Sequence, residues 1–151
     1  MHSRAVPASY VAAMSEQHAN TAPTAVLADA RMHELADRLL AGILAADETV
    51  VRQAYAVDAT IWHNFDQRDQ TVDENLVTLH DMHRRASGLA YTQVRRFLAP
   101  GGFVQQHVLV GQAKGGALEM PAMIRFWVHA GRITRLEEYL DTRQAMVMYT
   151  G

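Results

Sequence analysis

The stretch GRITRLEEYLD, residues 131–141, says most about the fold of this protein. We interpret it as a β-strand, whose successive side chains point to opposite faces with a period of two. Leu136, Glu138 and Leu140 share one face of such a strand. We therefore predict a strand over Ile133–Tyr139, and we expect a carboxylate to lie between two leucines on its apolar face.

The same period of two continues upstream of this stretch. It predicts three further strands, at Tyr91–Leu98, Phe103–Val110 and Leu118–Val128. Glycine-containing turns separate the four segments, at residues 100–102, 114–116 and 129–131. Consecutive strands joined by such short turns form an antiparallel meander.

The N-terminal half shows helical spacing instead. We predict helices over residues 29–43, 49–56 and 72–86, with a strand over residues 60–65. The third helix carries a capping box, Thr71 followed by Glu74, and we expect it to end at Gly88. Helices followed by a long sheet predict an α+β fold, in which three helices pack on one face of a curved antiparallel sheet.

Composition excludes several classes of protein. The chain has 151 residues, 49% of them hydrophobic, and a net charge of −2, which gives no basic surface for nucleic acid. It has no cysteine, and no apolar run is long enough to span a membrane.

We expect a flexible or loosely docked arm over residues 1–28 and one domain over residues 29–151. Without an export signal, the cytoplasm is the expected location.

Two phrases carry a resemblance to a known family: VDATIWH, residues 57–63, and GRITRLEEYLD. With the order of elements given above, they resemble the nuclear transport factor 2-like superfamily, and most closely its SnoaL-like and ketosteroid isomerase-like branch. The resemblance covers Asp29 to about Gln144. It implies a cone-shaped domain, a cystatin-like roll, whose bent sheet and helices enclose a deep apolar pocket. It also implies a homodimer.

The resemblance allows the known sites of the family to be compared position by position. Ketosteroid isomerases have a tyrosine, a carboxylate base and a second acid where this chain has Leu39, His63 and Ala122. The groups that stabilise an enolate in that reaction are therefore missing, which disfavours steroid isomerisation by that mechanism.

Members that resemble limonene-epoxide hydrolase have Tyr-x-Asn, Arg-x-Asp and a final Asp at the corresponding places. This chain has Trp62-x-Asn64, Gln105-x-His107 and Glu138 there. The asparagine is kept, but a histidine replaces the aspartate that activates water and a glutamine replaces its arginine. The pattern thus departs from epoxide hydrolysis while retaining polar groups in the pocket.

His107 and Glu138 are the expected catalytic residues. A carboxylate on an apolar wall needs a partner, and a His–Glu pair can tune an imidazole to accept a proton near neutral pH. The alternative is a core histidine bonded to a backbone carbonyl, with Glu138 reaching solvent.

Trp62, Asn64 and Gln105 are expected to bind substrate, with the amides donating to its oxygen. Alternation places His63 on the opposite face from Trp62 and Asn64, so His63 is the second choice for the pocket. Trp62 is equally consistent with a large core aromatic.

The remaining polar clusters are expected to be structural. His80 and His83 lack a third ligand, so we expect no metal site. Arg96 is expected on a solvated surface with its neighbouring arginines.

Two functions stay open at this point. The first is a cofactor-free acid/base enzyme, of the isomerase, cyclase, dehydratase or hydrolase type, acting on a small hydrophobic oxygenated substrate. The second is a module that binds an apolar ligand without catalysis, or that supports dimerisation.

Overall fold

The computed structural model describes residues 23–150, and its α+β architecture agrees with the predicted fold class. The helical elements are α2 (Pro23–Ala45), α3 (Glu48–Ala54), α4 (Val72–Arg85), α5 (Thr142–Ala145) and a 3₁₀ turn at Met146–Met148. Residues 1–22 of the expected arm lie outside the described residues. Helix α2 begins at Pro23 instead of Asp29, because proline is tolerated at the first position of a helix, where no N–H is needed.

The strands form one sheet in the order β2-β1-β6-β5-β4-β3. They are β1 (Tyr55–His63), β2 (Asp69–Gln70), β3 (Ala86–Ala99), β4 (Gly102–Ala113), β5 (Gly116–His129) and β6 (Arg132–Leu140). Strands β3 to β6 make the predicted antiparallel meander. Strand β1 pairs in parallel with β6, so the sheet as a whole is mixed.

Strand β1 starts earlier and ends earlier than expected. Helix α3 ends at Ala54, and Tyr55 already has extended backbone angles, so β1 begins there and not at Thr60. The strand ends at His63 because the chain then turns: the N–H of Gln67 donates to the carbonyl of His63 at 3.0 Å. His63 is therefore the last residue of β1.

Helix α4 begins as predicted and ends differently. Thr71 and Glu74 form both bonds of the capping box. The chain then passes directly into β3 at Ala86, so Gly88 does not end the helix. Gly88 has a φ of 60°, a backbone angle that glycine adopts without strain. It lies where the β3–β4 register shifts, and the strand bends there.

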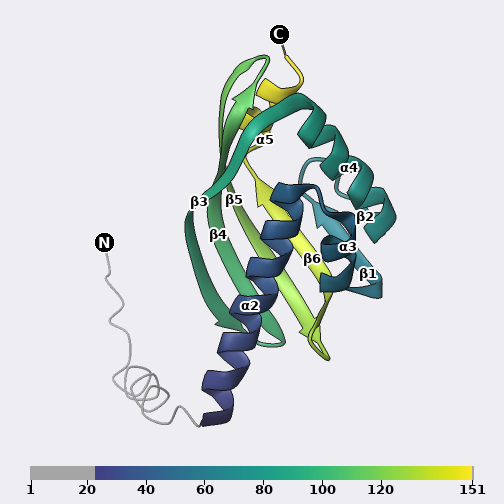
Figure 1. Ribbon diagram of the computed structural model, residues 1–151, viewed down its shortest axis with the longest axis vertical. Coiled ribbons are helices and arrows are strands. Elements are labelled where there is room, and N and C mark those ends of the chain that lie inside the picture. Colours follow the sequence, from purple (N-terminus) through teal and green to yellow (C-terminus); the bar gives the residue numbers. More distant parts are fainter. Residues whose placement is uncertain (1–22, 151) are drawn as a thin grey trace, which may run out of the picture.

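The bent sheet and the helices enclose the core. Figure 1 shows α2, α3 and α4 on one side of the sheet, with α5 close to the C-terminal end of β6. One apolar cluster lies under α2 and α3 and contains the stacked pair Phe103 and Phe126, with ring centroids 4.3 Å apart. A second cluster, around Leu118 and Met148, lies near the C-terminal elements. Among the described residues, no helix is long and apolar enough to cross a membrane.

Candidate functional site

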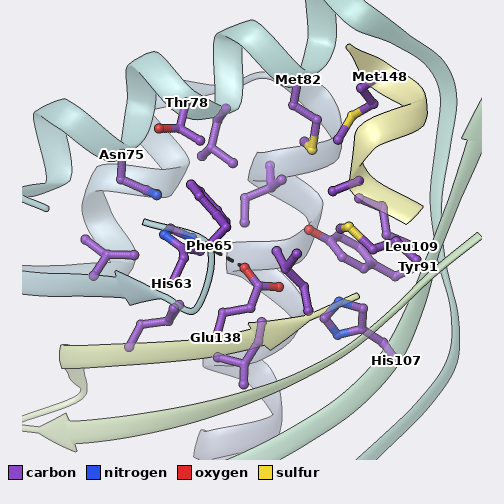
Figure 2. A pocket seen from close by; sticks show the side chains of 18 of the residues that line it. His63, Phe65, Asn75, Thr78, Met82, Tyr91, His107, Leu109, Glu138 and Met148 are labelled. Carbon is purple, nitrogen blue, oxygen red and sulfur yellow. Dashed lines mark ion pairs between the residues drawn. The ribbon is translucent and has the colours of Figure 1, made fainter. Parts of the chain in front are cut away.

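A cavity of about 260 Å³ lies between the sheet and the helices. Residues of both apolar clusters line it, including Leu39, Ile61 and Met120. Figure 2 shows polar side chains interrupting this apolar wall. The polar or titratable lining residues are Tyr55, His63, Asn75, Thr78, Tyr91, His107, Glu138, Thr142 and Tyr149.

Glu138 and His63 point toward each other in this cavity (Figure 2). They are directly opposite in the parallel β1–β6 pair, and His63 Nε2 lies 3.4 Å from a Glu138 carboxylate oxygen. Both side chains are largely shielded from solvent, at 7% and 16% exposure. A carboxylate in such surroundings needs a donor, and His63 supplies one.

This pairing corrects the expected His107–Glu138 pair. Within residues 23–150, the ion-pair partner of Glu138 is His63. The reason is the strand order, because β5 lies between β4, which carries His107, and β6, which carries Glu138. Two strand spacings separate the backbones by roughly 10 Å. Both side chains nevertheless line the same cavity.

His107 is 3% exposed and lies on the cavity wall with its ring edge-on to Tyr91. Its Nδ1 is 3.0 Å from the amide nitrogen of Gln105, and its Nε2 has no hydrogen-bond partner in the described part of the chain. Burial lowers the pKa of His107, and the charge of Glu138 opposes this effect only in part.

Gln105 does not line the cavity; it lies behind His107. Its side chain is fully buried, and its amide oxygen accepts a 2.7 Å hydrogen bond from Arg96 Nε. The Arg96 side chain is 10% exposed and contacts Asp37 of α2 at 2.7 Å. Arg96 is thus not on a solvated surface as expected, because its cross-strand neighbour is a buried amide.

Trp62 and Asn64 also lie outside the cavity, contrary to the first choice from the sequence. The β1–β6 register is regular from Thr60 to His63, so strict alternation turns His63 inward and Trp62 outward. Trp62 contacts Tyr139, with ring centroids 5.2 Å apart. The amide of Asn64 donates to the carbonyl of Leu140 at 3.0 Å and accepts from its N–H at 3.2 Å, which ties the ends of β1 and β6 together.

Sequence reasoning missed six of the nine polar or titratable lining residues: Tyr55, Asn75, Thr78, Tyr91, Thr142 and Tyr149. Tyr55 was placed inside a helix, Tyr91 was assigned only to a strand, and Asn75 was not singled out. The signal for Asn75 was its place one turn before Leu79, on the apolar side of α4. Burial, helped by the charge of Glu138, raises the pKa of Tyr55 and Tyr91, so their hydroxyls stay protonated and can donate hydrogen bonds.

The two histidines of α4 have separate partners. His80 Nε2 lies 3.0 Å from a carboxylate oxygen of Glu48, and His83 Nε2 lies 2.6 Å from the carbonyl of Ile43. Across residues 23–150, no three histidine or acidic side chains are grouped so that they could hold a metal ion.

Comparisons with known proteins were made by sequence and by structure. No protein-family model matches the sequence, and no curated protein sequence matches it. Among solved structures, IdmH from Streptomyces antibioticus, a proposed polyketide cyclase, has a TM-score of 0.68 at 15% identity, covering 78% of this chain and 97% of that one. A proposed SnoaL-like polyketide cyclase from Shewanella putrefaciens has a TM-score of 0.67 at 13% identity, covering 78% and 95%.

A third structure, the pinacolase BvnE from Penicillium brevicompactum, has a TM-score of 0.68 at 8% identity and covers 78% of this chain and 91% of that one. Likenesses at these identities establish the fold alone. The cavity, the bent sheet and the structural matches together show that this chain has the nuclear transport factor 2-like fold, in the form found in SnoaL-like and ketosteroid isomerase-like proteins.

Proposed function

We propose that this protein is a cofactor-independent acid/base enzyme that moves a proton on a small, mostly apolar, oxygenated ligand. The observation that carries the proposal is the carboxylate of Glu138, which lies in an apolar cavity at 16% exposure with His63 as its donor. A carboxylate that is shielded from water and held in one orientation is a suitable general base.

The cavity favours a neutral ligand. Its one acidic lining side chain is Glu138, and the described lining includes no lysine or arginine that could neutralise a ligand carboxylate. An anionic ligand would be repelled in this low-dielectric space. The volume of about 260 Å³ lies just below the usual range for ligand pockets, roughly 300–1,000 Å³, which suits a small molecule.

The chemistry follows from these groups. Glu138 accepts a proton from a carbon next to a carbonyl group, and the electron pair of the broken C–H bond moves to the carbonyl oxygen. The hydroxyls of Tyr55 and Tyr91 are protonated donors at the same cavity and can stabilise that oxygen. Return of the proton from Glu138 to another carbon gives an isomer. If the enolate carbon instead attacks a second carbonyl group, the new C–C bond closes a ring, and the resulting alkoxide takes the proton back from Glu138. The polyketide cyclases and the pinacolase among the structural matches support this class of ligand.

Hydrogen–deuterium exchange on carbon tests the proposal without knowledge of the product. Small neutral ketones and diketones that raise the melting temperature of the protein are incubated with it in D₂O, and loss of the α-proton signal is followed by NMR. We expect exchange by the wild type and a loss of at least about 100-fold in Glu138→Gln, the usual size of a general-base effect.

The matched control is Glu137→Gln, which removes the adjacent carboxylate on the other face of β6, where it pairs with Arg135. It should exchange at the wild-type rate. If ketones that fit the cavity bind but none of them exchanges its α-protons, this result contradicts the proposed enzyme. It then supports the alternative, a module that holds an apolar ligand. The homodimer and the cytoplasmic location stay predictions from the sequence.

A further inference from the structure

Four polar side chains form a continuous line from helix α2 to the cavity. Asp37 on α2 contacts Arg96 of β3, Arg96 donates to Gln105 of β4, and Gln105 contacts His107 two residues along the same strand. Arg96 and Gln105 are cross-strand neighbours, and Gln105 is fully buried. The line begins at the surface, where the Asp37 side chain is 69% exposed; the other three side chains are largely shielded from solvent, and the last of them lies on the cavity wall.

The hydrogen bonds along this line have one consistent set of directions. A guanidinium group only donates, so the amide oxygen of Gln105 faces Arg96 and its nitrogen faces His107. An amide nitrogen also only donates, so Nδ1 of His107 is the acceptor and carries no proton. A neutral imidazole has one N–H, which must then be on Nε2. The lowered pKa of His107 agrees with a neutral ring.

We propose that Asp37, Arg96 and Gln105 are positioning residues that hold His107 in the Nε2–H form, so that His107 donates a hydrogen bond to the ligand's oxygen. This inference rests on the proposed function, in which Glu138 is the base. It gives His107 the opposite role from the proton acceptor expected from the sequence.

The unpartnered Nε2 of His107 supports this role. It is buried, and no described residue satisfies it. A buried donor without a partner destabilises the empty cavity, and an oxygen of the ligand would satisfy it. The cavity then presents an acceptor, Glu138, on β6 and a donor, His107, on β4. A carbonyl compound with an acidic C–H next to its carbonyl carbon needs both groups at once, the acceptor for the proton and the donor for the carbonyl oxygen.

NMR of the full-length protein tests the assignment directly. In ¹⁵N-labelled wild type, two-bond correlations between ring nitrogens and carbon-bound ring protons show which nitrogen carries the proton. The His107 signals are identified among the eight histidines by their loss in His107→Gln. At a pH well above ~6.5, the ordinary pKa of histidine, we expect the proton on Nε2 and none on Nδ1. A proton on Nδ1 would overturn the proposal.

Substitution of Gln105→Glu should invert the tautomer. A carboxylate accepts from both neighbours, so it keeps the bond from Arg96 and requires a proton on Nδ1 of His107. The matched control is Gln106→Glu, which places the same charge one residue along β4 on the exposed face. We expect the Nε2–H form in the control and the Nδ1–H form in Gln105→Glu. An unchanged tautomer in a folded Gln105→Glu protein refutes the assignment, and if that variant does not fold, the wild-type spectrum decides.

Ligand exchange separates this inference from the function on which it rests. Loss of the Nε2 donor should slow α-proton exchange in Gln105→Glu by about 100-fold, as for removal of one oxyanion donor, while Gln106→Glu exchanges normally. If the wild type has Nε2–H but exchange does not depend on Glu138, the proposed function fails and the tautomer assignment stands. If exchange depends on Glu138 but His107 carries its proton on Nδ1, the function stands and this inference fails.

Discussion

Replacing Asn64 with alanine should destabilise the protein without removing a group from the cavity. The amide makes two hydrogen bonds to the backbone of Leu140, of 3.0 and 3.2 Å, in a partly buried position. Each is worth about 0.5–1.5 kcal/mol net, so their loss should lower the free energy of unfolding by about 2 kcal/mol. For a chain of this size, that corresponds to a fall in melting temperature of roughly 4–8 °C.

Urea denaturation followed by tryptophan fluorescence measures this loss. One of the two tryptophans, Trp62, lies in β1 two residues before Asn64 and reports on the β1–β6 contact. We expect a lower midpoint at an unchanged m-value. The rate of α-proton exchange, measured where the variant is folded, should change far less than it does in Glu138→Gln. A loss of less than about 0.5 kcal/mol, the range of an ordinary surface substitution, would show that the two bonds do not hold β1 to β6.

Asn64→Asp is the informative companion variant. An aspartate keeps the bond from the N–H of Leu140 but faces its carbonyl without a proton to donate. Protonation restores that donor, so the pKa of the new carboxyl is raised in the folded state. The folded state then binds more protons than the unfolded one, and the deficit relative to wild type should shrink as the pH falls from 7 toward about 4. An equal deficit at both pH values would contradict the assigned geometry.

Three further outcomes are expected. Burial lowers the pKa of His107, so the unfolded state binds a proton at this residue before the folded state does as the pH falls below ~6.5. The free energy of unfolding of the wild type should therefore fall below that pH, by at most about 1.4 kcal/mol per pH unit for one group. In chemical denaturation, His107→Gln should show a flatter dependence of this free energy on pH. Thr71→Ala removes the cap of α4 and should lower the unfolding free energy by about 1 kcal/mol, whereas no loss would mean that Glu74 caps the helix without it. Gly102→Ala places a Cβ on β4 against the carbonyl of Phe126 on β5. It should lower the free energy of unfolding by about 3 kcal/mol in the same denaturation assay. An unchanged free energy would show that the two strands separate freely at this end.

The local features of the fold could be predicted because they depend on neighbouring residues. The capping box at Thr71, the meander after residue 90 and the inward face of β6 all follow from spacing within a few residues. Glu138 was therefore placed correctly between Leu136 and Leu140, all three of which line the cavity.

The element boundaries near the site were less predictable. The helix predicted over residues 49–56 includes Tyr55, and only the packing of β1 against β6 shows where the strand starts. A glycine commonly marks the end of a helix, but Gly88 lies at a bend in β3. In both cases a tertiary contact overrode a local preference.

Residues 136–140 alone predict a carboxylate on an apolar strand face, because the alternation of side chains along a strand depends only on backbone geometry. Which group meets that carboxylate depends on how the strands pair. Strand β1 inserts in parallel beside β6 and brings His63 to Glu138, while β5 keeps His107 away. Pairing between strands far apart in the chain leaves no local signal, and for the same reason the line from Asp37 through Arg96 and Gln105 to His107 could be seen only in three dimensions.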